Sequence, residues 1–220
     1  MTMVRRLAPG VHVLEAPQRF LGLELGTRMT VLDLGGQLLI HSPVAVPPSV
    51  VEPLGEPRWV LAPNLMHHLY VGPWLDAGLE GWAAPGLPDK RPDLRFEGVI
   101  DGARHPFGPD VATHALRSFG ITNEVLVLHR PSRTLVVTDL VFNIAPTAPW
   151  LTRAGMRCVG GYPGCRVTLL ERFGMNRAAA REDLAVIAGW DFDRLILAHG
   201  EVIEEGGKRA LLEAFRWLEA

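Results

Sequence analysis

The stretch Arg194-Leu195-Ile196-Leu197-Ala198-His199-Gly200-Glu201 ends a short apolar strand in a histidine and a glycine. Earlier in the chain, Thr134-Leu135-Val136-Val137-Thr138-Asp139 ends a second apolar strand in an aspartate. Such runs are typical of strands buried on both faces of a sheet, so their polar ends lie at a sheet edge, where functional sites are usually built. We therefore expect Asp139 and His199 to face each other across one shared pocket.

The overall composition indicates one globular domain spanning residues 1–220, because 48% of the residues are hydrophobic and the charges nearly balance. The formal net charge of −2 gives no electrostatic reason to bind nucleic acid or anionic lipid. No apolar run approaches the roughly 20 residues that span a bilayer, and the first ten residues lack the apolar stretch of a signal peptide. We expect a cytoplasmic protein with no nucleic-acid or membrane partner. The oligomeric state is left open.

Strand-like and helix-like patterns alternate along the chain. Asn176 is a suitable N-cap for a helix that runs to Trp190, with apolar residues at helical spacing. A helix is also expected to begin near Pro73, because proline is tolerated in the first turn. This order predicts an α/β or α+β layered domain. Strands at 28–31 and 37–41 are expected to form one hairpin, and strands at 124–129 and 134–138 a second one. Further strands are expected at 58–62, 111–118 and 194–198, and a final helix at 208–218.

A second group of polar residues follows the strand at 58–62. The stretch from Asn64 to Tyr70 contains the adjacent histidines His67 and His68 on a loop at the strand's end. Imidazole both coordinates metal ions and titrates near neutrality, so both are candidate ligands or acid–base groups. The alternative is that one histidine packs beneath the following helix while the other meets solvent.

Two carboxylates invite different interpretations. Asp139 lies between apolar residues, and a buried carboxylate needs a ligand, a hydrogen-bond donor or a catalytic role, unless it merely caps the next turn. Glu124 precedes an apolar strand and is more readily interpreted as a surface carboxylate. The pair Lys90 and Arg91 is interpreted as a solvated loop pair rather than a site for an anionic substrate.

Taken together, these landmarks resemble the metallo-β-lactamase superfamily. The shared order is an N-terminal hairpin, a strand leading to a metal loop, a hairpin whose second strand ends in aspartate, and a late strand ending in His-Gly. Within the superfamily, the stretches at 64–70, 85–94 and 128–135 resemble a divergent branch of uncharacterised proteins, known as a domain of unknown function. The resemblance covers nearly the whole chain and implies an α/β fold, an αββα sandwich of two mixed sheets flanked by helices.

The resemblance also implies a metal loop of the form His-x-His-x-Asp-His. When its first histidine is placed at Asn64, the second falls at Met66, the aspartate at His68 and the last histidine at Leu69. A further ligand histidine falls near Phe119, which cannot coordinate a metal ion. Four of the histidine positions of the family are therefore lost, and His68 stands where the family has its aspartate.

What remains by this resemblance is His68, Asp139 and His199, a set of two histidines and one carboxylate for a single divalent metal ion (Zn, Fe or Mn). A slip of one residue in the alignment brings in His67 instead. Such a set with open positions can activate water or bind dioxygen. In the alternative interpretation the metal is gone, and the cleft binds a small molecule or catalyses without metal. The loss of four ligand positions favours this alternative.

The resemblance leaves the activity open, with hydrolysis as the candidate reaction. In a hydrolase, Asp139 and His199 would hold the metal or the attacking water, and His68 or His67 would be the third ligand or the general base. Asn64 would then be an oxyanion donor. The rival interpretations are a non-catalytic protein that binds a small molecule, and a purely structural protein in which Asp139 and His199 hydrogen-bond to each other.

Overall fold

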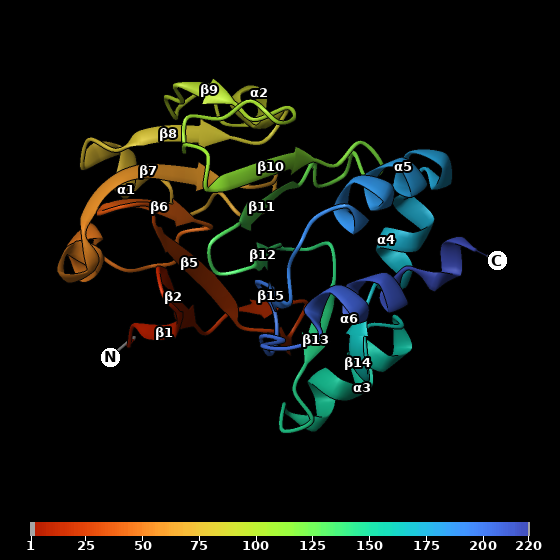
Figure 1. Ribbon diagram of the computed structural model, residues 1–220. Coiled ribbons are helices and arrows are strands. Elements are labelled where there is room, and N and C mark those ends of the chain that lie inside the picture. Colours follow the sequence, from red (N-terminus) through yellow and green to blue (C-terminus); the bar gives the residue numbers. More distant parts are fainter. Residues whose placement is uncertain (1–2, 220) are drawn as a thin grey trace.

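Two mixed β-sheets packed face to face form the centre of the molecule, and helices cover the outer face of each sheet (Figure 1). The computed structural model describes residues 3–219. This αββα arrangement confirms the fold class that the sequence predicts.

The larger sheet has seven strands among the described residues, in the spatial order β1, β2, β5, β6, β7, β8, β9. The pairs from β1 to β6 are antiparallel, whereas β6, β7, β8 and β9 run parallel to one another. The bounds in this order are Arg5–Ala8, Val11–Ala16, Thr27–Asp33, Gln37–His41, Glu56–Ala62, Glu80–Ala83 and Gly98–Val99.

The smaller sheet has the order β10, β11, β12, β15, with bounds Val111–Ala115, Val125–His129, Thr134–Val136 and Arg194–Ile196. Its first two pairs are antiparallel and β12 pairs with β15 in parallel. Two short antiparallel pairs lie outside these two sheets. They are β3 with β4 (Arg19–Phe20 and Leu23–Glu24) and β13 with β14 (Phe142–Ile144 and Gly164–Arg166).

The helices lie on both outer faces of the sandwich. Helices α5 and α6 pack on the smaller sheet, on the right of Figure 1, while α1, α2 and a 3-10 turn pack on the outer face of the larger one. The bounds are Gly72–Asp76 (α1), Leu87–Lys90 (α2), Trp150–Cys158 (α3), Leu169–Gly174 (α4), Arg177–Ala188 (α5) and Gly207–Ala214 (α6), with 3-10 turns η1 at Pro48–Leu54 and η2 at Arg216–Leu218.

Strand β11 shows why the central strands are apolar throughout. Val125 and Val127 point into the layer between the two sheets, whereas Leu126 and Leu128 point toward the helices. Successive side chains of a strand alternate between its faces, so a strand buried on both sides has no polar face. Burying a side chain of this size stabilises the fold by about 1.5–3 kcal/mol, which fixes the sheets as the rigid frame of the site.

The predicted elements are found with small differences at their ends. Asn176 caps α5 through its side-chain oxygen, which accepts from the backbone N–H groups of Ala178 and Ala179. Helix α1 begins at Gly72, next to Pro73, as expected. The final helix is shorter than predicted, because the regular α-helix ends at Ala214 and the chain continues as the 3-10 turn η2.

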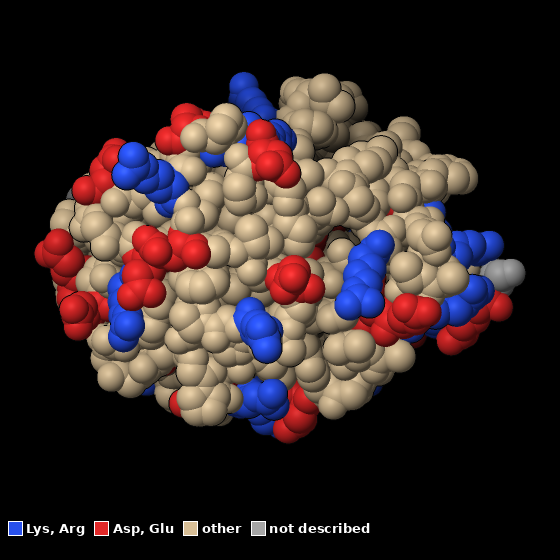
Figure 2. Space-filling view, turned by 90° about the horizontal axis from the view of Figure 1, so that it is seen from above, with Lys and Arg blue, Asp and Glu red and all other residues tan. Residues whose placement is uncertain are grey.

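The surface seen from above mixes acidic and basic side chains with wide areas that carry neither, without a field of one sign (Figure 2). Of the helices within residues 3–219, none has the length and apolar character needed to cross a membrane.

Candidate metal centre

Three side chains from three separate segments meet at the edge of the smaller sheet. The Nε2 atom of His67 lies 3.3 Å from Oδ1 of Asp139, and Nε2 of His199 lies 3.2 Å from the same oxygen. The two Nε2 atoms lie 3.3 Å apart. The three atoms therefore form a nearly equilateral triangle, and within the described chain these residues are the group that could hold a metal ion.

The strand register explains how two of these residues meet. In the parallel pair β12–β15, Val136 lies beside Ile196. Asp139 follows Val136 at the same distance along the chain as His199 follows Ile196, so both polar residues leave the sheet at the same edge. The expectation that Asp139 and His199 face each other is confirmed.

The hydrogen-bond pattern leaves the triangle short of positive charge. Nδ1 of His199 lies 2.6 Å from the carbonyl oxygen of Gly26, and a carbonyl only accepts, so Nδ1 carries the proton. In a neutral His199, Nε2 therefore carries a lone pair and acts as an acceptor. It faces the carboxylate of Asp139, which is an acceptor as well. Two acceptors 3.2 Å apart repel each other unless a metal ion or a hydrogen between them offsets the repulsion. The hydrogen can be a second proton on His199, or the N–H at Nε2 of His67 when Nδ1 of His67 accepts from the Ser42 hydroxyl.

The geometry fits a metal ion. Two ligand atoms that each lie about 2.0–2.1 Å from a tetrahedral zinc ion are about 3.3–3.4 Å apart. The three observed separations of 3.2, 3.3 and 3.3 Å agree with that spacing. Two imidazole nitrogens and one carboxylate oxygen are also a donor set that zinc, iron and manganese sites use.

His199 is held on several sides. Its ring stacks on Phe142, with ring centres 5.5 Å apart and planes 7° from parallel. The next residue, Gly200, has φ +87° and passes so close to Asn143 that a Cβ atom would lie 2.1 Å from the Asn143 carbonyl oxygen. Only glycine fits this exit from the strand, in line with the His-Gly pattern of the sequence.

Arg28, on β5, ties the His199 turn to the larger sheet. Its guanidinium donates to the carbonyl oxygens of Leu197 and of Gly200, which flank His199, the latter at 2.6 Å. Nη2 of Arg28 also donates to Glu15 Oε1 at 2.9 Å, which places a carboxylate beside the buried charge. The guanidinium is therefore a fixed bridge between the two sheets, directly behind the candidate ligand.

His67 is oriented by two polar residues. Its Nδ1 atom lies 2.8 Å from the hydroxyl oxygen of Ser42. The side-chain oxygen of Asn64 accepts from the backbone N–H groups of Met66 at 2.8 Å and of His67 at 2.6 Å, which closes the loop into a tight turn. This turn, rather than a regular element, decides which histidine points into the site.

Asn64 is fully buried and bonds directly to the third member of the triangle. Its Nδ2 atom donates to Asp139 Oδ2 at 2.8 Å and to Thr138 Oγ1 at 2.9 Å. Both hydrogens of the amide are thereby used within the protein. The expected role as an oxyanion donor has no free N–H in this arrangement, and Asn64 instead fixes the carboxylate so that Oδ1 faces the imidazoles.

Glu124 differs from the surface carboxylate expected from the sequence. It is buried, and its two oxygens accept from the backbone N–H groups of Thr138, at 2.5 Å, and Asp139, at 2.9 Å. Burial and the nearby charge of Asp139 raise the pKa of Glu124 to about 8. Burial alone would raise the pKa of Asp139 as well, but His67 and His199 outweigh it and hold that pKa well below its ordinary value.

His68, predicted as a metal ligand, lies outside the triangle. Nη1 of Arg91 donates to its Nδ1 atom at 2.9 Å, and Arg91 also pairs with Asp93. Burial and the charges of Lys90 and Arg91 lower the pKa of His68. His67, the alternative named beside His68, is the histidine that lies with Asp139 and His199. The correction arises because the Asn64 turn points His67 inward and turns the next side chain toward α2.

The other substituted positions of the family's ligand pattern contribute nothing to the triangle. Met66 and Leu69 are exposed, while Phe119 is buried in the core beside the smaller sheet. Within residues 3–219, His67, Asp139 and His199 are the one group of donor side chains close enough together to hold a metal ion.

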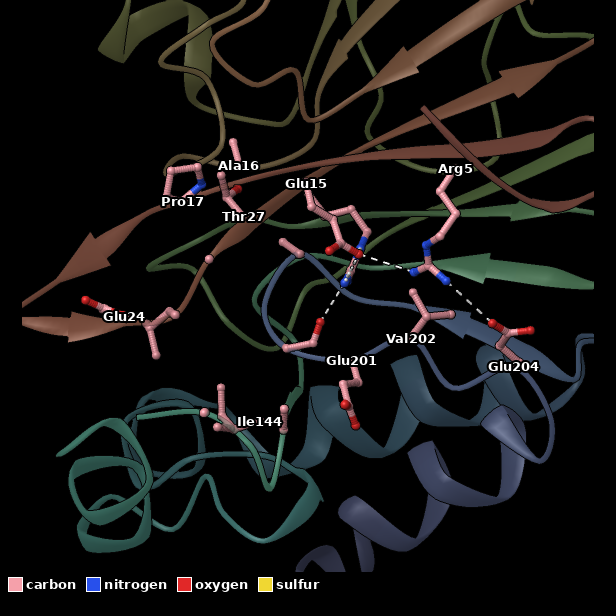
Figure 3. A pocket seen from close by; sticks show the side chains of 17 residues that line it. Arg5, Glu15, Ala16, Pro17, Glu24, Thr27, Ile144, Glu201, Val202 and Glu204 are labelled. Atoms are coloured by element: carbon pink, nitrogen blue, oxygen red, sulfur yellow. Dashed lines mark hydrogen bonds and ion pairs between the residues drawn. The ribbon is translucent and has the colours of Figure 1, made fainter. Parts of the chain in front are cut away.

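A cavity of about 710 Å³ lies between the end of β2, the start of β5 and the turn after β15, where Glu15, Thr27 and Glu201 are among the residues that line it (Figure 3). Arg5 crosses it, with an ion pair of 3.2 Å to Glu15 and one of 3.7 Å to Glu204. Its lining includes Gly26, Ala198 and Gly200, but none of the three residues of the triangle. The cavity therefore borders the backbone that supports the site rather than its donor atoms.

Several of these supporting groups have little or no signal in the sequence. The carbonyl oxygen of Gly26 and the ring of Phe142 cannot be identified by residue type. Arg28 carries a signal, because a charged residue inside the buried strand β5 must have partners. Ser42 carries none, because its φ of +54°, which is uncommon for serine, is seen only in the folded chain.

No protein-family model matches this sequence, and no curated protein matches it either. Solved structures do match, at low sequence identity. A metallo-beta-lactamase from Hirschia baltica is 10% identical with a TM-score of 0.68, covering 99% of this chain and 97% of its own. The metallo-beta-lactamase IND-7 is 12% identical with a TM-score of 0.67, covering 99% and 98%. The FIM-1 enzyme of Pseudomonas aeruginosa, in its mono-zinc form, is 10% identical with a TM-score of 0.65, covering 97% and 96%. Over nearly its whole length, the chain has the metallo-β-lactamase fold.

Proposed function

We propose that this chain holds one divalent metal ion, zinc by preference, between His67, Asp139 and His199 and acts as a metal-dependent hydrolase on a small molecule. The observation that carries the proposal is the triangle formed by Nε2 of His67, Oδ1 of Asp139 and Nε2 of His199, whose sides of 3.2–3.3 Å match the ligand spacing of a tetrahedral metal site. A similar fold that is described in a mono-zinc form adds support.

A metal ion bound there would supply a Lewis acid with an open coordination position, the requirement for activating water. The protein's own part is to place the donors. Nδ1 of each imidazole is fixed from behind, by Gly26 for His199 and by Ser42 for His67, so each Nε2 is directed at Asp139. Such partners orient ligands and raise their basicity.

The loss of the remaining ligand positions of the family makes the site a single-metal one. A single-metal site is in line with the resemblance of the sequence to a divergent branch of uncharacterised proteins. Because the three family histidines of the other position are replaced by Asn64, Met66 and Phe119, we propose that Asn64 holds Asp139 and has no ligand role.

Metal analysis of the protein, purified without chelator or histidine tag, tests the proposal. The expected result is about one equivalent of zinc, iron or manganese, and its loss in His199→Ala. Adding zinc at 100 times its dissociation constant should also stabilise the metal-free protein by about 2.7 kcal/mol. Absence of metal, together with an unchanged melting temperature on adding each of the three ions, would contradict the proposal.

A second candidate rests on the same triangle. In this candidate a proton on Nε2 of His199, instead of a metal ion, joins that atom to Asp139. The result is a buried ion pair with a structural role. The protein would then bind a small molecule without metal. The 3.2 Å separation of Nε2 and Oδ1 suits this pair too. The metal analysis separates the two candidates, because a protonated imidazole cannot coordinate a metal ion.

A further inference from the structure

A group of exposed apolar side chains lies on residues 150–174, here called the α3–α4 segment, which comprises α3, β14 and α4 at the right of Figure 1. Trp150 is 72% exposed, Leu170 61% and Phe173 85%. In the same segment Thr152 and Met156 are buried and anchor α3 to the fold. Several large apolar side chains exposed within one short segment are typical of an interaction site rather than an ordinary surface. Further exposed apolar residues of the segment are Leu151, Val159 and Leu169.

A backbone hydrogen bond joins the two helices of the segment. The backbone N–H of Leu169 donates to the carbonyl of Val159 at 2.7 Å, which joins the start of α4 to the end of α3. Exposed apolar residues of the two helices therefore lie on connected backbone. Thr152 Oγ1, near the start of α3, accepts from the N–H of Glu24 at 3.0 Å and so joins β4 to the segment.

The β3–β4 hairpin extends this surface. Leu23 packs against Gly155 of α3, where a Cβ atom would lie 2.9 Å from its methyl groups. At the tip, Leu21 is 87% exposed and has a φ of +48°. This left-handed conformation is unfavourable for leucine, and here it holds an apolar side chain out in solvent. Exposed fractions this high mean that Leu21, Trp150 and Phe173 stand out from the surface as separate projections.

The charges of the α3–α4 segment are almost all of one sign. The segment carries four arginines, Arg153, Arg157, Arg166 and Arg172, and one carboxylate, Glu171. Glu171 is buried and hydrogen-bonded to Thr168, so it does not face solvent. Arg157 and Arg166 are exposed. The net charge of −2 for the whole chain therefore hides a local basic surface.

This pairing of features decides the kind of partner. Projecting tryptophan, phenylalanine and leucine side chains insert among lipid head groups and the ends of acyl chains, and arginines beside them meet anionic head groups. Arg157 also lies over the ring of Tyr162, with its guanidinium carbon 5.0 Å from the ring centre, an aromatic and cationic pair suited to a water–lipid boundary. A folded protein partner, in contrast, is expected to meet a flatter or concave surface with paired charges.

We propose that the α3–α4 segment and the tip of the β3–β4 hairpin form a docking surface for anionic lipid bilayers. Trp150, Phe173 and Leu21 enter the interface, and Arg157 and Arg166 contact the head groups. Docking is reversible and peripheral. It departs from the expectation of no membrane partner drawn from net charge, and it goes beyond the proposed function, because neither depends on the other.

Sedimentation of the full chain with lipid vesicles tests this proposal. Vesicles of phosphatidylcholine with phosphatidylserine should bind the protein, vesicles of phosphatidylcholine alone should bind it less, and binding should weaken as salt rises. Arg157→Gln should lower binding about fivefold, since each basic residue near the surface contributes about 1 kcal/mol. The matched control, Arg104→Gln, changes an exposed arginine outside the segment and should leave binding unchanged.

The apolar part is tested by the double variant Trp150→Ser, Phe173→Ser, which should reduce binding by more than the single arginine change. Val186→Ser on α5, also at an exposed position, is its control. An unchanged melting temperature shows that the double variant is folded; if it is not, the salt series on the unmodified protein still decides. No binding to phosphatidylserine vesicles, or equal binding by the Arg157→Gln and Arg104→Gln variants, would overturn the proposal. So would self-association of the free protein that the double variant abolishes, because the surface would then belong to a second copy of the chain.

Discussion

Asp139 and Asp183 are both aspartates with little exposed side chain, 12% and 5%, and both lie beside a histidine, yet they differ in what surrounds their oxygens. Asp183 accepts from the backbone N–H groups of Arg117 and Ser118, at 3.1 and 3.0 Å, and lies 2.8 Å from Nε2 of His114. Its carboxylate is thus surrounded by donors, and it ties α5 to the segment that follows β10. This is the pattern of a structural carboxylate.

Asp139 has a donor of fixed identity at only one oxygen, because Oδ2 accepts from Asn64. Oδ1 faces Nε2 of His67 and Nε2 of His199, and because Nδ1 of His199 donates to Gly26, Nε2 of His199 is an acceptor whenever that ring is neutral. The comparison shows that a buried histidine–aspartate contact is not informative by itself. What distinguishes a candidate metal site is that acceptor atoms outnumber donors there and that each ligand side chain is fixed by a hydrogen bond at its other polar atom.

The largest effect should come from Asp139→Asn. Removing one of three donors should lower zinc affinity by more than about 100-fold, because even residues behind the ligands are worth 10–100-fold. Competition with a chromophoric chelator measures this. The matched change Asp183→Asn should leave zinc affinity as it is, and equal losses in both variants would remove the distinction between the two aspartates.

The support behind His199 should have the next largest effect. Arg28→Lys retains the charge but cannot bond both the Leu197 and Gly200 carbonyls in the fork geometry of a guanidinium. We expect zinc affinity to fall about 10-fold, within the range for residues that orient ligands, and the same chelator competition measures it. The control is Arg133→Lys, at an exposed ion pair with Asp191. A wild-type affinity in Arg28→Lys would show that this bridge does not position His199.

Asp183→Asn should act on stability instead. An amide in place of the carboxylate turns one acceptor oxygen into an N–H group that faces a backbone donor, so unfolding free energy should fall by about 1–3 kcal/mol in urea titrations. The His114 contact and the hydrogen bonds of Ser118 outweigh burial and lower the pKa of Asp183. Its contribution is therefore present above the pKa of an unfolded aspartate and is lost as pH falls below it. A variant as stable as the wild type at pH 7 would contradict the structural role.

An effect of opposite sign is expected from Glu124, whose pKa is raised to about 8. Between the ordinary glutamate pKa of about 4.3 and about 8, the folded chain keeps a proton that the unfolded chain releases. Stability of the metal-free protein should therefore decrease as pH rises through this window. Glu124→Gln lacks this term, so relative to the wild type its unfolding free energy should gain about 1.4 kcal/mol for each pH unit between pH 5 and pH 8. Urea titrations at both values measure the difference, and a constant difference would contradict the raised pKa.

The strand patterns predicted the part of the site that depends on sheet register. Val136 and Ile196 pair in parallel, so Asp139 and His199 had to emerge together. The choice between His67 and His68 could not be made in the same way, because it depends on a turn closed by the Asn64 side chain. Turn geometry of this kind is set by tertiary contacts, and residue spacing alone does not reveal it.

Glu124 was misjudged for a related reason. It stands before an apolar strand, a place where carboxylates usually meet solvent, but its oxygens meet the backbone that leads into Asp139. The sequence contains no pairing signal between residues 124 and 138–139. The sheet edge was thus predictable from periodicity, whereas the side-chain and carbonyl partners behind it required the folded arrangement.

Calorimetric titration of zinc into metal-free protein, with the variants His67→Gln and His68→Gln side by side, tests the central claim most directly. The two histidines are neighbours in sequence, but only His67 lies in the triangle with Asp139 and His199. We predict one zinc ion per chain, lost in His67→Gln and retained in His68→Gln. Retention of zinc in His67→Gln with loss in His68→Gln, or no heat of binding in the unmodified protein, would contradict it.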